Sequence, residues 1–456
     1  MKNCGTLSQT MEYLLKIQPE LNAVTEFAEN PEQSVQGGKL DGIQVALKDN
    51  VSTSGLRTTA SSMILDNYVP VYDATIVRKL KDAGAVIVCK TAMDELGMGG
   101  TGLNACTGPV GNPWDLSRIP SGSSSGSAAV VAAGAVPLAI GTDTGDSIRK
   151  PAAFCGVVGV KPTYGRISRY GIIPYASSLD HVGYFTTGIE DAALALEVLA
   201  GRDDHDMTSS NLPVENYAEN LNGSLQGKTI GVLTNVVEKA APEVRKIFDD
   251  LMDQARAAGA RIVDVRMPDE LMAFIAPVYK TIANAEATAN HSNLDGLRFG
   301  VRKPGESVEE VMTNSRTAGF SSQVRERFVV GSYSLFEENQ DRIFRKAQKI
   351  RRVLVDAYAR LFENVDVVAA PASPDIAPLV EDVMNKPKTS SDRFEEEFMQ
   401  LANFSGYPSL TMPMGSRDGM PVGINLTAKP FEEQTLFDTS LGLENLTGMK
   451  GVTCTL

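Results

Sequence analysis

The feature that most constrains this chain is a long stretch, residues 98–188, in which Gly, Ser and Thr dominate. Such a composition is often disordered, because few large side chains offset the entropy lost on folding. This stretch also carries apolar runs at 136–140 and 154–158, which can bury it. Buried Gly-rich backbone brings many N–H groups close to a ligand, as anion and oxyanion sites require. We therefore expect the stretch to hold a functional site.

Outside this stretch the pattern alternates between strands and helices, as in α/β proteins. Strands are expected at 43–47, 85–89, 229–233, 261–265, 365–370, 409–412 and 423–427. Helices are expected at 6–17, 74–82, 127–133, 242–258, 307–313, 323–354 (interrupted near Gly331) and 433–446, with a surface loop over 381–392. Nothing resembles a long flexible linker, so we expect one large domain over 1–456.

Two glycine patterns imitate known motifs without their context. Gly97-x-Gly99-x-x-Gly102 fits a dinucleotide fingerprint, but residues 91–96 look like a turn and helix rather than a strand, and no phosphate-loop Lys-Ser/Thr follows. Gly122-x-Ser124-x-Gly126 fits a nucleophile elbow, which needs an apolar strand before it and a later histidine. Residues 115–121 are mostly polar, so neither motif is favoured.

Histidine is scarce, which limits the chemistry that the chain can carry out. The 456 residues contain only three: His181, His205 and His291. There is no HExxH pattern and no Cys/His cluster, so no metal site is predicted. The five cysteines are scattered without a CxxC pair and indicate reduced thiols rather than a disulfide framework.

The charge balance narrows the class of partner. A formal net charge of −13 argues against autonomous binding to nucleic acid or to an anionic membrane. No secretory signal is apparent in residues 1–18, and the most apolar stretch, 127–140, is too short to span a bilayer. We expect a cytoplasmic protein.

A lysine–serine design remains possible. Lys48 directly follows the apolar strand 43–47, where burial can lower the pKa of a lysine enough for it to act as a base. Ser123 and Ser147 both lie in Gly-rich settings and are candidate nucleophiles. Spacing alone does not join the three residues, and a lone lysine at a strand end is usually a surface residue.

Three motifs together resemble the amidase signature family: Pro120–Ala129, Gly141–Ala152 and Gly156–Arg166. Within it, the chain is similar to the glutaminase subunits of tRNA-dependent amidotransferases. That similarity also involves Asn112–Asp115, Tyr175–Asp180, Thr208–Val214, Asp295–Gly300, Lys346–Arg351 and Gly419–Ile424. The resemblance implies one α/β domain with a mixed twisted β-sheet covered by helices on both faces.

The resemblance also assigns catalytic roles. Lys48 matches the family's catalytic lysine, Ser147 the nucleophile, and Ser123 the middle serine, whose preceding peptide is cis in the family. Ser147 would attack the side-chain amide of glutamine, and Ser123 would relay the proton towards neutral Lys48. Backbone N–H groups would hold the oxyanion; they belong to Thr144, Gly145, Asp146 and Ser147.

Substrate and partners follow from the same resemblance. Arg351 matches the arginine that pairs with the glutamine carboxylate, and Glu396 falls near an acid for the amino group, with Glu395 and Glu397 beside it. The partners would be the B and C subunits of the amidotransferase. Ammonia would pass through a tunnel to the B subunit, where Glu-tRNA(Gln) or Asp-tRNA(Asn) is amidated. ATP and Mg²⁺ would be used by that partner, and no cofactor is expected in this chain.

This sequence departs from the family pattern near the nucleophile. Ser121 and Ser125 replace glycines of the serine loop, and Asp146 replaces the glycine directly before Ser147. Its carboxylate would repel a developing oxyanion unless it points away or pairs with a cation such as Arg149. Two alternatives therefore stay open: a free-standing amidase acting on another small amide, and a scaffold protein impaired by Asp146.

Overall fold

An eleven-stranded mixed sheet forms the centre of the computed structural model, which describes residues 1–385, 397–454 and 456. The strands are β1 (Val24–Phe27), β2 (Gln44–Lys48), β3 (Val86–Thr91), β4 (Leu138–Asp143), β5 (Val158–Lys161), β6 (His181–Thr186), β7 (Thr229–Leu233), β8 (Arg261–Val265), β9 (Val367–Pro371), β10 (Ser409–Arg417) and β11 (Met420–Ala428). Their order across the sheet is β1-β3-β2-β4-β6-β5-β10-β11-β9-β7-β8.

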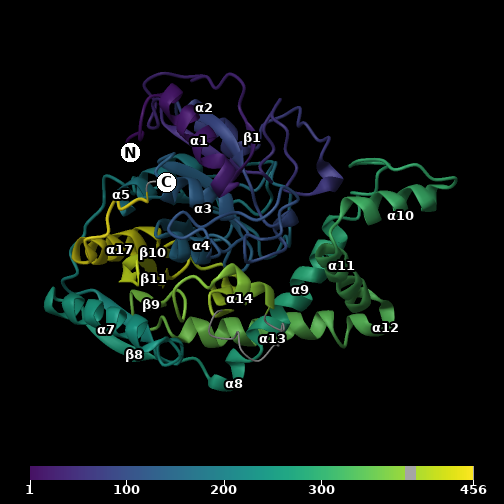
Figure 1. The fold of residues 1–456 in the computed structure, drawn as a ribbon. Coiled ribbons are helices and arrows are strands. Elements are labelled where there is room, and N and C mark those ends of the chain that lie inside the picture. The colour runs from purple at the N-terminus through teal and green to yellow at the C-terminus, as the bar shows by residue number, and fades with distance from the viewer. Residues whose placement is uncertain (386–396, 455) are drawn as a thin grey trace.

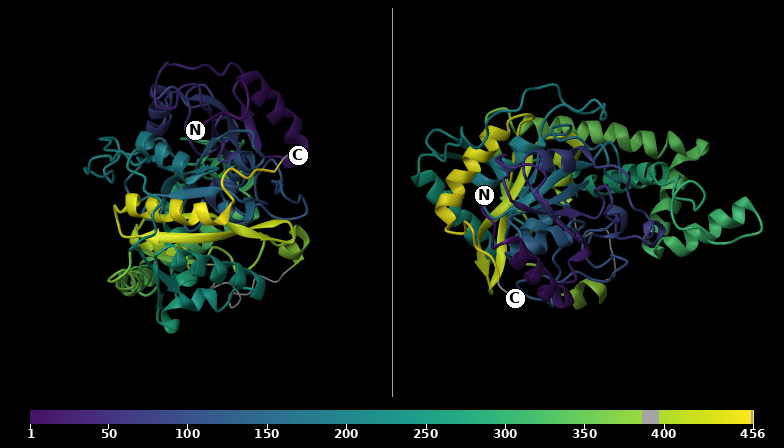
Figure 2. Two further views of the ribbon diagram at one scale, coloured as in Figure 1. Left: turned by 90° about the vertical axis from the view of Figure 1, so that its left-hand side faces the viewer. Right: turned by 90° about the horizontal axis from the view of Figure 1, so that it is seen from above.

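Helices surround this sheet (Figure 1). They are α1 (Leu7–Leu21), α2 (Thr75–Asp82), α3 (Ser125–Ala132), α4 (Arg149–Cys155), α5 (Ile189–Leu199), α6 (Thr234–Val237), α7 (Pro242–Ala257), α8 (Asp269–Met272), α9 (Ile275–Asn290), α10 (Val308–Gly319), α11 (Ser322–Leu335), α12 (Glu337–Gln340), α13 (Phe344–Arg360), α14 (Val380–Asn385), α16 (Gln400–Ser405) and α17 (Glu433–Thr447). In Figures 1 and 2, α10 projects away from the part that contains the sheet.

The sheet is parallel near both ends, apart from the antiparallel edge strand β1, and antiparallel in the middle. β2 pairs in parallel with β3 and β4, and β7 pairs in parallel with β8 and β9. The strands from β4 through β6, β5, β10 and β11 to β9 are joined by antiparallel pairs. This mixed α/β architecture agrees with the predicted fold class.

Side chains alternate along β2 between two apolar cores, because successive residues of a strand point to opposite faces. Val45 and Leu47 pack with residues of α2, α5 and α17 on one face. Ala46 packs with α1 and α3 on the other. The period of two therefore directs Lys48 to the face that α3 covers.

Helix α3 explains why the middle of the chain is rich in small residues. All eight residues of α3 are buried, and none is larger than valine. A Cβ on Gly126 would lie 2.4 Å from the carbonyl oxygen of Ala23 and 2.7 Å from the backbone N of Ala92. Larger side chains would hold the helix away from the sheet, so the composition serves close packing.

Some of the predicted elements differ from the structure. Gly331 does not interrupt a helix: it lies within α11, where a Cβ would come 2.2 Å from the carbonyl oxygen of Asn284, so glycine permits α9 and α11 to pack closely. The interruption comes at Phe336, whose ψ of 142° is extended. The helix expected at 307–313 continues to Gly319. Of the predicted loop 381–392, residues 381–385 belong to α14, and the others lie outside the described residues.

Candidate active site

Lys48 ends strand β2 and is completely buried. Its Nζ donates to Ser123 Oγ at 2.8 Å and to Ser124 Oγ at 2.9 Å. It also donates to Thr142 Oγ1 at 2.9 Å and to the Thr142 carbonyl oxygen at 3.3 Å. The lysine therefore joins the end of β2 to the serine loop and to β4, and no carboxylate lies within ion-pair distance of it among the described residues.

Burial controls the protonation of this lysine. Removal from water lowers the pKa of Lys48 to about 7, although the more distant carboxylates Asp94, Asp143 and Asp180 favour its charged form. About half of the lysine is then neutral at pH 7, as a general base requires. Its neighbours are hydroxyl groups that exchange protons, so the arrangement can pass a proton between Ser123 and Lys48.

Ser123 is buried in the loop before α3, and the Gly122–Ser123 peptide bond is cis. Ser124 Oγ donates to the Thr142 carbonyl oxygen at 3.0 Å, which attaches the loop to β4. Ser121 has a φ of 64°, a left-handed conformation that favours glycine, and its Oγ donates to the carbonyl oxygen of Gly100 at 3.0 Å. The loop thus keeps its shape with serine in place of one glycine.

Ser147 is buried in the turn that joins β4 to α4. A buried ion pair holds this turn: Arg149 Nη2 lies 2.9 Å from Asp143 Oδ1, and its Nε donates to Asp143 Oδ2 at 3.1 Å. Asn403 Nδ2 donates to Asp143 Oδ1 at 2.8 Å. Burial alone would raise the pKa of Asp143, but Arg149 and Asn403 hold it far below its usual range.

An aromatic ring covers the turn around Ser147, the predicted nucleophile. A Cβ on Gly145 would lie 2.9 Å from Tyr279 Cζ, so glycine at this position lets the ring pack on the backbone. Thr144 Oγ1 donates to Asp180 Oδ1 at 2.7 Å, and Asp180 also accepts from the backbone N–H of Tyr175 at 2.8 Å. The predicted oxyanion residues Thr144, Gly145 and Asp146 therefore lie in a braced turn directly before Ser147.

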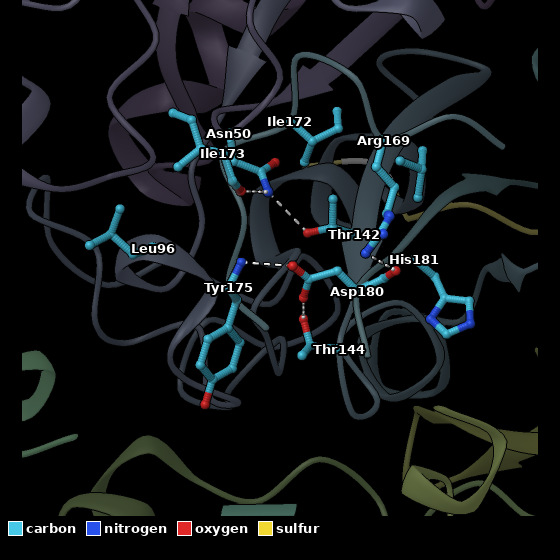
Figure 3. Close-up of a pocket in the computed structure, with 12 residues that line it drawn as sticks. Asn50, Leu96, Thr142, Thr144, Arg169, Ile172, Ile173, Tyr175, Asp180 and His181 are labelled. Atoms are coloured by element: carbon cyan, nitrogen blue, oxygen red, sulfur yellow. Dashed lines mark hydrogen bonds between the residues drawn. The ribbon is translucent and has the colours of Figure 1, made fainter. Parts of the chain in front are cut away.

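A cavity of about 10 Å³, enough for one water-sized molecule, lies beside this turn (Figure 3). In Figure 3 the Thr144 hydroxyl points to the Asp180 carboxylate, and the Asn50 amide points to the Thr142 hydroxyl, a contact of 3.2 Å. In the same view the Tyr175 ring lies to the left of Asp180 and Thr144. Polar side chains such as Asn50 and Thr144 and apolar side chains such as Leu96 and Ile173 line this small cavity together.

The partners of Arg149 do not include the carboxylate of Asp146. Arg149 is completely buried and donates to Asp143, Asn403 and the carbonyl oxygens of Gly145 and Met399. Among the described residues no hydrogen bond reaches the Asp146 carboxylate, so Arg149 does not pair with it directly. Burial raises the pKa of Asp146 to about 7.

The structure describes only one of the two predicted substrate-binding residues, Arg351. Arg351, on α13, donates to Ser178 Oγ at 2.9 Å and to the carbonyl oxygens of Ser178 and Phe404. Burial lowers its pKa. These hydrogen bonds connect α13 to the loop before β6 and to α16. Glu396 lies outside the described residues.

Among the described residues no histidine forms a hydrogen bond with Lys48, Ser123 or Ser147, although His181 lines the cavity in Figure 3. His181 is buried, its Nδ1 lies 2.6 Å from the Leu179 carbonyl oxygen, and burial lowers its pKa well below the usual value. His291 is also buried, and His205 contacts Asp203 near the surface. Among the described residues no three His, Cys, Asp or Glu side chains are placed to hold a metal ion. No helix in this part of the chain is long and apolar enough to cross a membrane.

A family model described as Amidase matches residues 6–437. The chain belongs to the amidase family. This amidase is 41% identical over 409 residues to the A subunit of the glutamyl-tRNA(Gln) amidotransferase of Sulfurihydrogenibium sp., covering 89% of this chain and 84% of the relative. It is 43% identical over 397 residues to the protein of the same name from Roseiflexus sp. (strain RS-1), covering 87% and 80%.

Solved structures agree with this assignment. The A subunit of the glutamyl-tRNA(Gln) amidotransferase of Thermotoga maritima superposes on the amidase with a TM-score of 0.82 and 34% sequence identity, covering 96% of this chain and 90% of that one. The peptide amidase of Stenotrophomonas maltophilia superposes with a TM-score of 0.81 and 30% identity, covering 97% and 93%. One fold therefore serves proteins with different names and different substrates.

Several residues of this amidase site were not singled out from the sequence. Thr142 bonds Lys48, as does Ser124, which was considered only as the serine of a disfavoured nucleophile elbow. Both lie inside the motifs that carried the resemblance, so the motifs contained the signal. Asn403 and Tyr279 lie far along the chain, on α16 and α9. No local pattern marks these two, because their role depends only on the tertiary contact.

Proposed function

We propose that this amidase is the glutamine-hydrolysing subunit of a tRNA-dependent amidotransferase. The observation that carries the chemistry is the contact of 2.8 Å between Ser123 Oγ and the fully buried Lys48 Nζ. Support for the substrate comes from the relatives, which are named as amidotransferase subunits and match over most of both chains.

Hydrolysis begins when Ser147 Oγ attacks the side-chain amide carbon of glutamine. The proton of Ser147 passes to Ser123, whose own proton passes to neutral Lys48. Backbone N–H groups of the turn from Thr144 to Ser147 hold the oxyanion, each such donor contributing about 3–4 kcal/mol of transition-state stabilisation. A fixed turn needs little reorganisation at that moment, and the Asp143–Arg149 pair fixes it.

The reverse proton transfer completes the first half-reaction. Lys48 returns its proton through Ser123 to the leaving nitrogen, which departs as ammonia, and Ser147 remains esterified by the glutamyl group. Water activated by the same relay then releases glutamate and restores Ser147. In this proposal Arg351 binds the glutamine carboxylate and Glu396 lies near the amino group.

The ammonia passes to a partner, the B subunit, which amidates Glu-tRNA(Gln) or Asp-tRNA(Asn) in a cytoplasmic heterotrimer that also holds the C subunit. ATP and Mg²⁺ act in that partner, so this chain needs no cofactor of its own. The net charge of −13 suits a protein that makes ammonia and leaves the tRNA to its neighbour.

The test uses Ser147→Ala in the complex co-expressed with the B and C subunits. Glutamine-dependent amidation and ammonia release from glutamine are expected to disappear, because the nucleophile is gone. Amidation with added ammonium salts is expected to persist, because the second reaction uses free ammonia. Exposed Ser8→Ala, at a site without hydrogen-bond partners in the described part of the chain, is the control and retains both activities.

The same assays separate the alternatives. A full glutaminase rate in Ser147→Ala would show that the nucleophile is wrongly assigned. Turnover of unrelated small amides by the isolated chain, without glutamine turnover in the complex, would favour a free-standing amidase; the likeness to a peptide amidase motivates this arm. An intact wild-type complex that shows no glutaminase activity would favour a scaffold impaired by Asp146.

A further inference from the structure

Gly99 and Gly102, from the glycine pattern of residues 97–102, lie against a buried carboxylate. That carboxylate belongs to Asp94, which is completely buried. A Cβ on Gly99 would lie 2.7 Å from Asp94 Oδ2, so a larger residue at this position would displace the carboxylate. Gly102 has a φ of 77°, a left-handed conformation that glycine adopts easily, and its N–H donates to Asp94 Oδ2 at 3.1 Å. The pattern therefore encloses an acidic side chain of the protein itself.

Three backbone N–H groups from one loop hold this carboxylate in place. Asp94 Oδ2 accepts from the N–H groups of Thr101 and Gly102 at 3.1 Å each, and Oδ1 accepts from the N–H of Asn104 at 3.0 Å. A buried carboxylate needs such donors to offset the loss of water, and together they leave it one position. Asp94 thus fixes the loop 101–104 to the segment that follows β3.

The same residue contacts the serine loop. A Cβ on Gly122 would overlap Asp94 Oδ2, so the carboxylate packs directly on the backbone before Ser123. The backbone N–H of Asp94 donates to the Ser123 carbonyl oxygen at 3.2 Å. Leu96 and Gly97 continue this segment along the small cavity of Figure 3, and a Cβ on Gly97 would lie 3.9 Å from Ser123 Oγ. The segment that begins at Asp94 therefore forms the surface on which Ser123 rests.

We propose that Asp94 is a positioning residue, which holds Ser123 where its Oγ contacts Lys48 Nζ. This inference rests on the proposed proton relay and names a support for its middle serine. The serine loop, residues 121–125, contains only serine and glycine, so it has no large side chain of its own to fix its shape. The contact of 2.8 Å between Ser123 and Lys48 requires a fixed loop. A displacement of about 1 Å can cost about 100-fold in rate.

Gly99→Ala tests the packing without removing a charge. Its Cβ would meet the Asp94 carboxylate, so we expect kcat for ammonia release from L-glutamine, in the complex with the B and C subunits, to fall about tenfold or more. KM should stay within about twofold, because the relay acts after the substrate has bound. The matched control is Gly100→Ala, whose Cβ meets nothing within 4 Å and which should keep the wild-type rate. Neither glycine has a positive φ. Equal kcat values in the two variants would overturn the inference.

Asp94→Asn tests the carboxylate itself. The new NH₂ group cannot accept from the loop N–H groups, so the support loosens, and we expect kcat to fall about tenfold or more. Asp295→Asn is the matched control, because Asp295 is also buried and accepts from the N–H groups of Leu297 and Arg298 at 2.9 Å each, in a different loop. Both variants should lose stability in urea, but only Asp94→Asn should lose kcat. An equal loss of kcat in both contradicts a specific role for Asp94.

A comparison in the Ser123→Ala background decides whether Asp94 acts through Ser123. Ser123→Ala alone is expected to leave glutamine hydrolysis about 10²–10⁴-fold below the wild type. Adding Asp94→Asn or Gly99→Ala should then change the remaining rate by less than about twofold, because the residue that they position is already gone. A further loss as large as in the wild-type background overturns the inference. Failure of the proposed function is a separate result, namely glutamine hydrolysis that survives Ser147→Ala.

Discussion

In the proposed mechanism, the whole proton relay depends on the titration of Lys48. Its Nζ must be neutral to accept a proton from Ser123, and burial lowers its pKa to about 7. The sign is clear: above this pH the base is available, and below it the base is protonated and activity is lost. We therefore expect kcat/KM to rise with pH for glutaramate, a substrate that keeps the amide and the carboxylate of glutamine but lacks its amino group.

The size of the effect follows from the pKa. The neutral fraction of Lys48 is about one-tenth at pH 6, one-half at pH 7 and nine-tenths at pH 8. The rate should then rise about fivefold from pH 6 to 7 and about twofold from pH 7 to 8. Lys48→Arg keeps a positive donor near Ser123 but never loses its proton in this range, so we expect a loss of about 10²–10⁴-fold.

The assay measures ammonia release by the complex between about pH 5.5 and 9, the range over which the fold is expected to persist. The matched control is Lys349→Arg, which changes an exposed lysine on α13. The control should follow the wild-type profile. A profile that is flat between about pH 6 and 8, or a Lys48→Arg variant with a wild-type rate, would refute the role of Lys48 as the base. Circular dichroism of each variant separates loss of the base from loss of the fold.

Two further predictions concern the scaffold of the site. Asp143→Ala should lower the free energy of unfolding in urea by about 3–5 kcal/mol, because it leaves Arg149 buried without its ion pair; a loss below about 1 kcal/mol would contradict this account. Gly126→Ala should cost about 1–3 kcal/mol or more, because its Cβ would meet the Ala23 carbonyl oxygen at 2.4 Å. Gly100→Ala, which meets nothing within 4 Å, is the control, and equal losses in both would refute the packing argument.

Local motifs marked the candidate catalytic segments because their composition reflects local demands. The serine loop and the Gly141–Ser147 turn need small residues and particular backbone conformations, and these needs are visible in a few consecutive letters. The strand ending at Lys48 was likewise visible as an apolar run. Here the sequence pattern and the structure differ by only a residue or so.

Helix boundaries in the 307–354 region were predicted less well. Glycine is a plausible helix breaker in a sequence, yet Gly331 lies inside α11 because α9 packs against it. The chain turns instead at Phe336, which no propensity marks as a boundary. Tertiary packing overrides local propensity at both positions.

The sequence by itself determined the α/β class, the resemblance to the amidase family and the identity of Lys48, Ser123 and Ser147 as candidates, since all of these are written in local patterns. Only the tertiary structure decided which charges meet. It buried Lys48 among hydroxyl groups, and it committed Arg149 to Asp143 rather than to Asp146. Burial and the choice of partner depend on segments that lie far apart in the chain, and their electrostatic effects exist only when folding excludes water between them.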